Sequence, residues 1–283
     1  MGFSQLKDLV DAEVTGGAFS IASFRKTPSQ TTVSPVPFDL SMAAGNPSAQ
    51  FYASEPLVAA LINAKYGLSV GGDPTDTNHL AELMVLSTSS GFAPGSFLLC
   101  DYLLYYPFVD MDNTDTQLMD NTVTLPRYQS GSGVRIFAVA QSPSIGSGAF
   151  SVTYVNQDGV TNSTGTISCS SGVTNIASSI IGVPSGSIRS GFFLPLAAGD
   201  TGVQSITSVT FSSANGGLAA FVLVKPLTSI ELEETISPAE INYYKDRPSL
   251  PRIVSGAVLN FIAMSGASAA GAPVIGTIKT VWN

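Results

Sequence analysis

The spacing of apolar and polar residues divides the chain into two regions with different periods. In residues 54–67, SEPLVAALINAKYG, the apolar side chains fall at helical spacing, at Leu57, Val58, Leu61 and Ile62. Ser54 is a suitable N-cap, Pro56 suits the first turn, and Gly67 suits the left-handed residue that ends a helix. This stretch therefore predicts an amphipathic helix.

The remainder of the first 90 residues predicts further helix and an extended segment. Leu6, Leu9 and Val10 share one helical face before Gly16 and Gly17, and residues 76–87 also fit a short helix. Residues 27–50 contain four prolines and predict an extended arm. Such an arm either crosses a neighbouring subunit or forms a long surface loop.

From about residue 91 the pattern becomes that of short β-strands. Apolar Phe150, Val152 and Tyr154 alternate with Ser151 and Thr153, which is the period of a half-buried strand. The segment NQDG at 156–159 is a hairpin turn, and Gly, Asn, Asp, Ser and Pro separate the other apolar runs. We therefore predict a mainly β fold, an antiparallel, jelly-roll-like β-sandwich over residues 91–283, preceded by N-terminal helices and a Pro-rich arm over residues 1–90.

One helix is expected inside the β region. Ser237 is placed to cap it, Pro238 suits its first position, and Glu240 completes a capping box. Pro248 and Pro251 limit it at the other end. The pattern predicts a short helix near 237–246.

Composition then narrows the function. Only 11% of the 283 residues are charged, against about 25% in ordinary soluble domains, and the net charge is −8. The 12 Lys and Arg residues form no cluster, so we expect no nucleic-acid partner. A surface of small neutral residues suits a chain that packs against copies of itself or other proteins better than a freely diffusing enzyme.

The sequence also bears on compartment. The charged residues among 1–14 interrupt any apolar run, so we expect no signal peptide, and no apolar run is long enough to predict a membrane span. Cys100 and Cys169 lie in apolar strand patterns and form no CxxC pair. We expect both thiols to be reduced and buried.

Motifs for catalysis are missing. The sequence contains no GxSxG elbow, no phosphate-binding GxxxxGK[ST] loop and no GxGxxG after a strand. His79 is the single histidine, and with two separated cysteines it cannot build a common zinc site. We expect no enzyme activity, no catalytic residue and no cofactor.

The acidic stretch DMDNTDTQLMDN at 110–121 is the main candidate for chemistry. It does not fit an EF-hand, which needs Gly at position six and Glu at position twelve, where this sequence has Asp115 and Asn121. Three interpretations are open: a solvated turn, an irregular Ca²⁺ site of Asp110, Asp112 and Asp115, or paired carboxylates for glycoside hydrolysis. We expect an exposed turn without an essential metal, because charged residues at a strand connection discourage pairing with other strands.

Several phrases resemble virion structural proteins of tailed bacteriophages. They are TVTLPRYQSGSGVRIFAVAQSP, FSVTYVNQDGV and LNFIAMSGASAAGAPVIGTIKTVW, within the C-terminal two thirds. The resemblance implies a β-rich protein of the virion, assembled in the host cytoplasm, and carries no catalytic residue. It favours a capsid-coating or decoration protein that binds the major capsid protein. The low surface charge together with the Pro-rich arm predicts that the chain also binds its own copies, as a trimer.

Two alternatives stay open. One is a tail or baseplate component. The other is a carbohydrate-binding or hydrolysing β-sandwich at the host surface, which would need exposed aromatic side chains beside the acidic stretch. The aromatic run DYLLYYPF at 101–108 is the candidate platform, although its Leu-rich spacing favours a core or a subunit interface.

Overall fold

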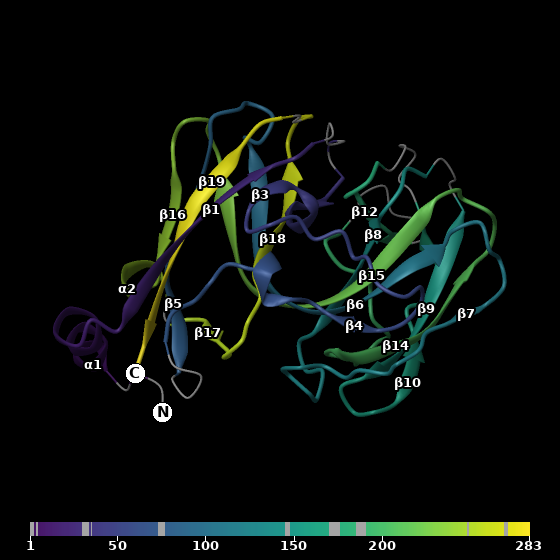
Figure 1. The fold of residues 1–283 in the computed structure, drawn as a ribbon, viewed down its shortest axis with the longest axis horizontal. Coiled ribbons are helices and arrows are strands. Elements are labelled where there is room, and N and C mark those ends of the chain that lie inside the picture. The colour runs from purple at the N-terminus through teal and green to yellow at the C-terminus, as the bar shows by residue number, and fades with distance from the viewer. Residues whose placement is uncertain are drawn as a thin grey trace.

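The computed structural model describes residues 3, 5–29, 34, 36–72, 77–144, 148–169, 176–184, 191–247, 249–268 and 271–283. The fold is mainly β, with antiparallel sheets and a short helical segment near the N-terminus (Figure 1). The predicted fold class is confirmed.

The strands of the described residues form three sheets. Sheet I has the order β16-β5-β19-β1-β3, with β17 also paired to β5. Its strands are β1 (Phe19–Thr27), β3 (Ala44–Asn46), β5 (Asn78–Ser87), β16 (Ala239–Asn242), β17 (Arg252–Ile253) and β19 (Val274–Trp282). Sheet II has the order β13-β11-β9-β14-β7, with β10 paired to β9. Its strands are β7 (Gln117–Leu118), β9 (Ala149–Asn156), β10 (Thr161–Ser163), β11 (Ile167–Ser168), β13 (Val183–Pro184) and β14 (Val203–Phe211).

Sheet III joins the two lobes seen in Figure 1. Its order is β12-β8-β15-β6-β18-β2, with β4 paired to β6. Its strands are β2 (Phe38–Asp39), β4 (Ala60–Leu61), β6 (Gly95–Asp110), β8 (Arg135–Ala140), β12 (Ile180–Ile181), β15 (Leu218–Leu232) and β18 (Leu259–Ser265). The long strands β6 and β15 pair with each other over their whole length and run through both lobes.

Each end of sheet III packs on a different sheet. The first part of β6, with Phe97 and Leu99, shares a core with Leu83 and Val85 of sheet I. The later part, with Leu103, Leu104 and Tyr106, shares a core with sheet II. On the opposite face of sheet III, a third cluster joins strand residues to the segment before β5; it includes Cys100, Tyr102, Tyr105, Tyr52 and Ile62. The structure therefore has two sandwiches that share two strands.

Alternation in the sequence explains the strands that were predicted correctly. In β9 every second residue is buried, beginning at Phe150, and its outward neighbours are half-buried Ser, Thr and Val. Only one face of sheet II packs against the core. The alternation in β9 therefore follows from burial of every second side chain on that face. The turn after β9 holds Gly159 at φ 76°, as the NQDG signal requires.

Two of the three helices predicted in the N-terminal region, over residues 54–67 and 76–87, are wrong. Residues 54–67 contain strand β4 and a single 3-10 turn, η3 (Ala64–Tyr66), and residues 78–87 form strand β5. Leu57 has φ 62°, which no helix permits, and Asn63 rather than Ser54 acts as a cap, to Lys65. The strand β5 lies between β16 and β19, so sheet I spans the boundary expected at residue 90.

The remaining predicted elements are correct in part. Near 237–246, residues 239–242 form edge strand β16 and only α2 (Tyr243–Asp246) is helical, with Asn242 as its cap in place of Ser237. The N-terminal segment is helical, as α1 (Leu6–Val10) followed by the π-helical η1 (Asp11–Thr15). The predicted arm, as far as it is described, contains β2, the 3-10 turn η2 (Leu40–Met42) and β3, while residues 30–33 and 35 lie outside the described residues.

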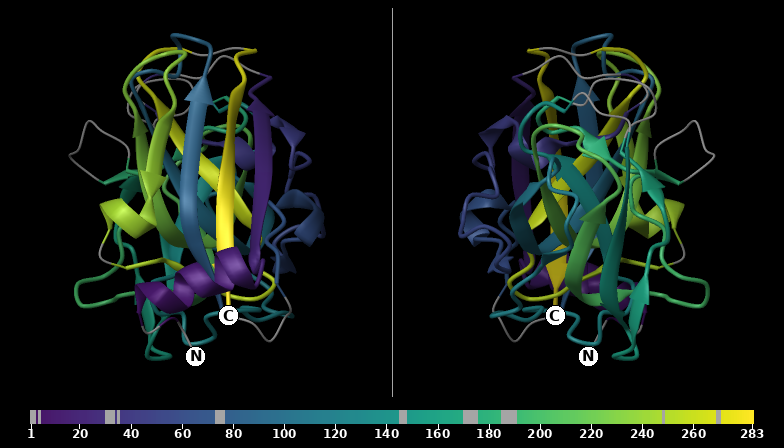
Figure 2. Two further views of the ribbon diagram at one scale, coloured as in Figure 1. Left: turned by 90° about the vertical axis from the view of Figure 1, so that its left-hand side faces the viewer. Right: turned by 90° about the vertical axis from the view of Figure 1, so that its right-hand side faces the viewer.

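The N-terminal helical segment lies across one end of sheet I (Figure 2). Leu9 packs there on Ala81 of β5 and Val281 of β19. Glu13 of η1 accepts hydrogen bonds from Lys279 and Tyr244, which fastens the segment to β19 and α2. The outer face of β1 stays open beside it, with Phe19 and Ile21 exposed.

Candidate functional site

The acidic stretch at 110–121 runs from the end of β6 through the connection to β7, and it includes β7 and the three residues after it. Its aspartates are exposed, and they take part in local turn hydrogen bonds and in one hydrogen bond to a distant loop. Asp110 Oδ1 accepts from the Asp112 amide at 2.9 Å, and Asp112 Oδ1 accepts from the Gly216 amide at 2.6 Å. Asp115 is held only through its own amide, which donates to Asn113 Oδ1 at 2.9 Å. The three proposed Ca²⁺ ligands are thus on one loop, with two of their carboxylates already accepting backbone hydrogen bonds.

Neither a metal cluster nor a catalytic site around His79 is seen in the described residues. Among the described residues, no group of three or more His, Cys, Asp and Glu side chains is arranged to hold a metal. His79 lies on β5, half-buried against the ring of Phe3, with the two ring centroids 5.5 Å apart. Burial lowers the pKa of its imidazole, and its neighbour across the sheet is Arg252 rather than a nucleophile.

The aromatic run beside the acidic stretch faces inward. Tyr102 and Tyr106 are fully buried, Tyr105 is buried, and only Phe108 is half-exposed. The Tyr106 hydroxyl accepts from the Ile206 amide at 3.0 Å and donates to Asn121 at 2.7 Å, which ties β6 to sheet II. These residues belong to the core, and they do not supply the exposed platform that a sugar-binding site would need.

A buried carboxylate, Asp39, organises the far side of sheet III. Hydrogen bonds from Tyr52, from Tyr102 at 2.8 Å and from the Ser41 hydroxyl at 2.7 Å converge on it. Burial raises the pKa of Asp39, and these donors oppose the rise because they stabilise the ionised form. The side chains that bind it are buried, so the network anchors β2 to β6, although Asp39 also lines a hollow of about 200 Å³ together with Phe51 and Gln141.

Lys26 is buried in the same region, on β1. Its ammonium donates to the carbonyl oxygens of Ala43 and Pro47, each at 2.8 Å, and of Ser41 at 3.2 Å. Burial lowers its pKa to about 8, while the charge of Asp39 acts in the opposite direction. The three carbonyl oxygens match the three N–H donors of an ammonium group, so Lys26 fastens the segment 41–47 to β1 of sheet I.

A buried ion pair lies between the two cores. Asp101 on β6 follows Leu99 of one core and precedes Leu103 of the other, and its carboxylate is fully buried. Arg127 binds it with two hydrogen bonds, from Nε at 2.8 Å and from Nη2 at 2.6 Å, and the Val258 amide donates a third at 2.8 Å. Burial raises the pKa of Asp101, and Arg127 opposes this rise. The pair therefore ties the connection before β8 to the middle of β6.

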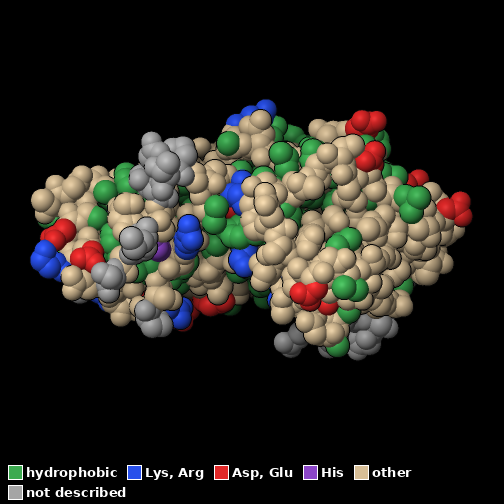
Figure 3. All heavy atoms as spheres, turned by 90° about the horizontal axis from the view of Figure 1, so that it is seen from below, with side chains coloured by type: hydrophobic (Ala, Val, Ile, Leu, Met, Phe, Trp, Pro, Cys, Tyr) green, Lys and Arg blue, Asp and Glu red, His purple; other side chains and the backbone are tan. Residues whose placement is uncertain are grey.

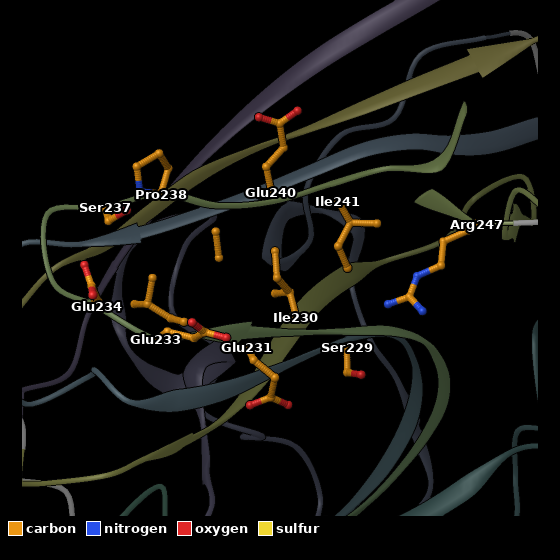
Figure 4. Close-up of a pocket in the computed structure, with 12 residues that line it drawn as sticks. Ser229, Ile230, Glu231, Glu233, Glu234, Ser237, Pro238, Glu240, Ile241 and Arg247 are labelled. Atoms are coloured by element: carbon orange, nitrogen blue, oxygen red, sulfur yellow. The ribbon is translucent and has the colours of Figure 1, made fainter. Parts of the chain in front are cut away.

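A surface groove of about 610 Å³ lies between β15 and β16. We call it the edge groove. It is lined by residues 229–234, 237–241 and 247. In Figure 4 Ile230 and Ile241 point into the space between the two strands, whereas Glu231 and Glu240 point away from it. The loop 233–238 closes one end, and a hydrogen bond from Tyr243 to Thr228 crosses beyond the other.

Apolar residues form the floor of the edge groove and acidic residues its rim. Ile230, Leu232 and Ile241 are 4%, 1% and 8% exposed and belong to the core between sheets I and III. The rim carries Glu231, Glu233, Glu234 and Glu240, all exposed, against the single base Arg247. Because the whole chain has only 20 acidic residues, four of them around one groove concentrate negative charge there.

Sequence reasoning did not find this groove. Apolar and acidic residues alternate in Ile230-Glu231-Leu232-Glu233, and this local pattern does predict a strand with one buried face. That β15 would lie beside β16 depends on pairings with β5 and β6, more than 100 residues away, which no local pattern encodes.

Figure 3 shows one side of the molecule, where small polar side chains and backbone dominate and Lys and Arg are scattered. Among the described residues no helix is long and apolar enough to cross a membrane.

No protein-family model matches the sequence, and no curated protein matches it either. The fold is weakly similar to VP2, a protein of infectious bursal disease virus. A VP2 point mutant in T=1 particles is 8% identical with a TM-score of 0.18, covering 94% of this chain and 78% of VP2. VP2 of a subviral particle is 9% identical with a TM-score of 0.18, covering 94% and 80%. The Gx strain structure is 10% identical with a TM-score of 0.15, covering 94% and 81%. A similarity this weak concerns the fold alone and supports no conclusion about function.

Proposed function

We propose that this chain is a non-enzymatic structural component of a tailed-phage particle. In the favoured form it coats or decorates the capsid, binds copies of itself and attaches to the major capsid protein of the head shell. The observation that carries the proposal is the edge groove, because its apolar floor and unpaired strands suit contact with another protein. A tail or baseplate role is the alternative placement.

The surroundings of the buried carboxylates support this proposal. The carboxylates with the most perturbed surroundings, Asp39 and Asp101, are satisfied by core partners and hold strands together. A catalytic carboxylate needs access to a substrate as well as a shifted pKa. The sequence resemblance to virion proteins and the low surface charge favour the same conclusion.

The proposal is tested by quantitative mass spectrometry and cross-linking of purified particles from a host that carries this sequence. We expect the chain at a copy number comparable to that of the shell protein, with cross-links to that protein. Cross-links confined to tail proteins would favour the alternative placement, and absence from purified particles would overturn the proposal.

A further inference from the structure

Two strand edges face the edge groove without strand partners. β15 pairs with β6 from Leu218 to Leu232, but with β8 only from Ala219 to Val224. β16 pairs with β5 on one side only. Within the described part of the chain, the β8-side edge of β15 from residue 225 to 232 and the outer edge of β16 therefore have no strand partner, although the Asn242 amide at the end of β16 donates to Asp246. An unpaired edge presents backbone donors and acceptors in the spacing of a strand, and a further strand can pair with it.

We propose that the edge groove binds a short extended segment of a partner protein, with apolar and basic residues in alternation, which extends sheet III beyond β15. The inference rests on the proposed function in one respect, namely that the partner is another protein of the particle.

The length of the segment follows from the ends of the groove. The strand residues 229–232 lie between the loop 233–238 and the contact of Thr228 with Tyr243. Four residues of strand extend over roughly 13 Å. A segment of four or five residues fits, and a longer strand would collide with the Tyr243 side chain.

The side chains of the segment follow from the alternation on β15. Next to Ile230 and Leu232, a neighbouring strand turns apolar side chains toward the same floor, where Ile241 also lies. Beside Glu231, the cross-strand neighbour is on the outer face, where Lys or Arg is favoured. Glu233, Glu234 and Glu240 add to this preference, and Arg247 alone opposes it, so that the rim has four acidic residues against one base.

A second copy of this chain does not fit the charge requirement. Its net charge is −8, and its 12 basic residues are dispersed. In the basic pair Arg25-Lys26, Lys26 is buried and the strand is already paired with β19 and β3. The occupant is therefore a basic segment of a different protein.

Disulfide tethering tests the inference with a defined probe, because it measures weak binding. A Ser237→Cys variant places a thiol on the rim, while Cys100 and Cys169 are buried and do not compete. The full-length variant is equilibrated in a thiol–disulfide buffer with the peptide Cys-Gly-Lys-Val-Lys-Val-Lys. Matched peptides replace Lys with Glu, or carry N-methyl groups on the backbone amides of the alternating segment. The mixed disulfide is quantified by mass spectrometry.

We expect at least tenfold more mixed disulfide with the basic peptide than with either matched peptide. Adding Glu231→Lys and Glu240→Lys should remove the preference for the basic peptide. An Ala214→Cys control, at an exposed residue between β14 and β15 and outside the groove, should show no sensitivity to N-methylation. Equal labelling by the basic and N-methylated peptides at Ser237→Cys would overturn strand addition, and a charge preference unaffected by the Glu substitutions would overturn the role of the rim.

These outcomes are independent of the particle experiment. A chain present in particles but without tethering preference refutes the groove inference alone. A chain that tethers the basic peptide but is absent from particles refutes the proposed function alone.

Discussion

At the scale of single residues, Lys26 has the clearest measurable consequence. Its folded-state pKa is about 8, against 10.5 for an unburied lysine. Between these values the unfolded chain binds more protons than the folded chain, so stability must rise with pH across that window. Below pH 8 the cost of burying the charge is fully present, and above 10.5 it is gone.

We predict that Lys26→Met abolishes this rise. Measured by denaturant unfolding at pH 7, 9 and 10, the wild-type protein should gain up to about 3 kcal/mol over Lys26→Met as the pH increases. At pH 7 the variant also loses the hydrogen bonds to Ala43, Pro47 and Ser41, which costs about 1–3 kcal/mol. Lys65→Met, at an exposed lysine, serves as the control and should run parallel to the wild type. Parallel curves for Lys26→Met as well would show that the buried ammonium does not titrate in this window.

At the scale of elements, we expect the shared strands β6 and β15 to couple the unfolding of the two lobes. Leu99 belongs to the core with sheet I and Leu104 to the core with sheet II, although both lie on β6. Leu99→Ala should destabilise the protein by about 2–5 kcal/mol, as expected for a fully buried leucine. Since the shared strands run through both lobes, protection from hydrogen exchange should fall in both.

Mass-spectrometric hydrogen exchange of Leu99→Ala checks this prediction, with β9 of sheet II as the reporter in the distant lobe. Leu118→Ala, at a leucine that is 72% exposed, is the matched control and should change stability by less than about 0.5 kcal/mol. A loss of protection confined to sheet I would mean that the lobes unfold separately.

The elements also show how far the sequence predicts the fold. β9 and its NQDG turn were predicted because alternation and turn chemistry are local signals. β5 was predicted as a helix because its ten residues, NHLAELMVLS, include good helix formers and lack a clean alternation of apolar and polar side chains. Its pairing with β19, almost 200 residues later, overrides that propensity. In the same way Ser54, Pro56 and Gly67 are suitable capping residues, but Leu57 and its neighbours contact β6 and sheet II instead.

The connection from β6 to β7 gives a prediction about metal binding. Replacing Asp110, Asp112 and Asp115 together with Asn should leave the fold nearly intact, within roughly 0.5 kcal/mol per site, because Asn Oδ1 accepts the same hydrogen bonds from the Asp112 and Gly216 amides. Thermal unfolding with and without a chelator is the measurement, and no shift is expected. A drop of several degrees that added Ca²⁺ reverses, and that the triple Asn variant lacks, would establish a Ca²⁺ site by mass action.

At the scale of the whole molecule, the surface combines low charge with exposed apolar side chains. Phe19 and Ile21 on β1 are 41% and 60% exposed, and Val10 and Val14 of the adjoining helical segment are 46% and 76% exposed. Within the residues that the structure describes, β1 has an open edge before Arg25, since β3 pairs only with Arg25 to Thr27. Exposed apolar side chains beside an unpaired strand edge are typical of a contact between protein chains.

We predict that the purified chain self-associates, with a trimer as the expected species, and that this β1 surface takes part. Sedimentation velocity at micromolar concentration should show no dominant monomer. Ile21→Lys places a charge in the middle of the apolar surface, where it would have to be desolvated on association, so it should shift the distribution toward monomer. Val160→Lys, at a valine that is 53% exposed on the β9–β10 turn, adds the same charge elsewhere and should leave the distribution unchanged. A stable wild-type monomer of 29.2 kDa would refute self-association, and an equal response to both lysines would place the contact outside β1.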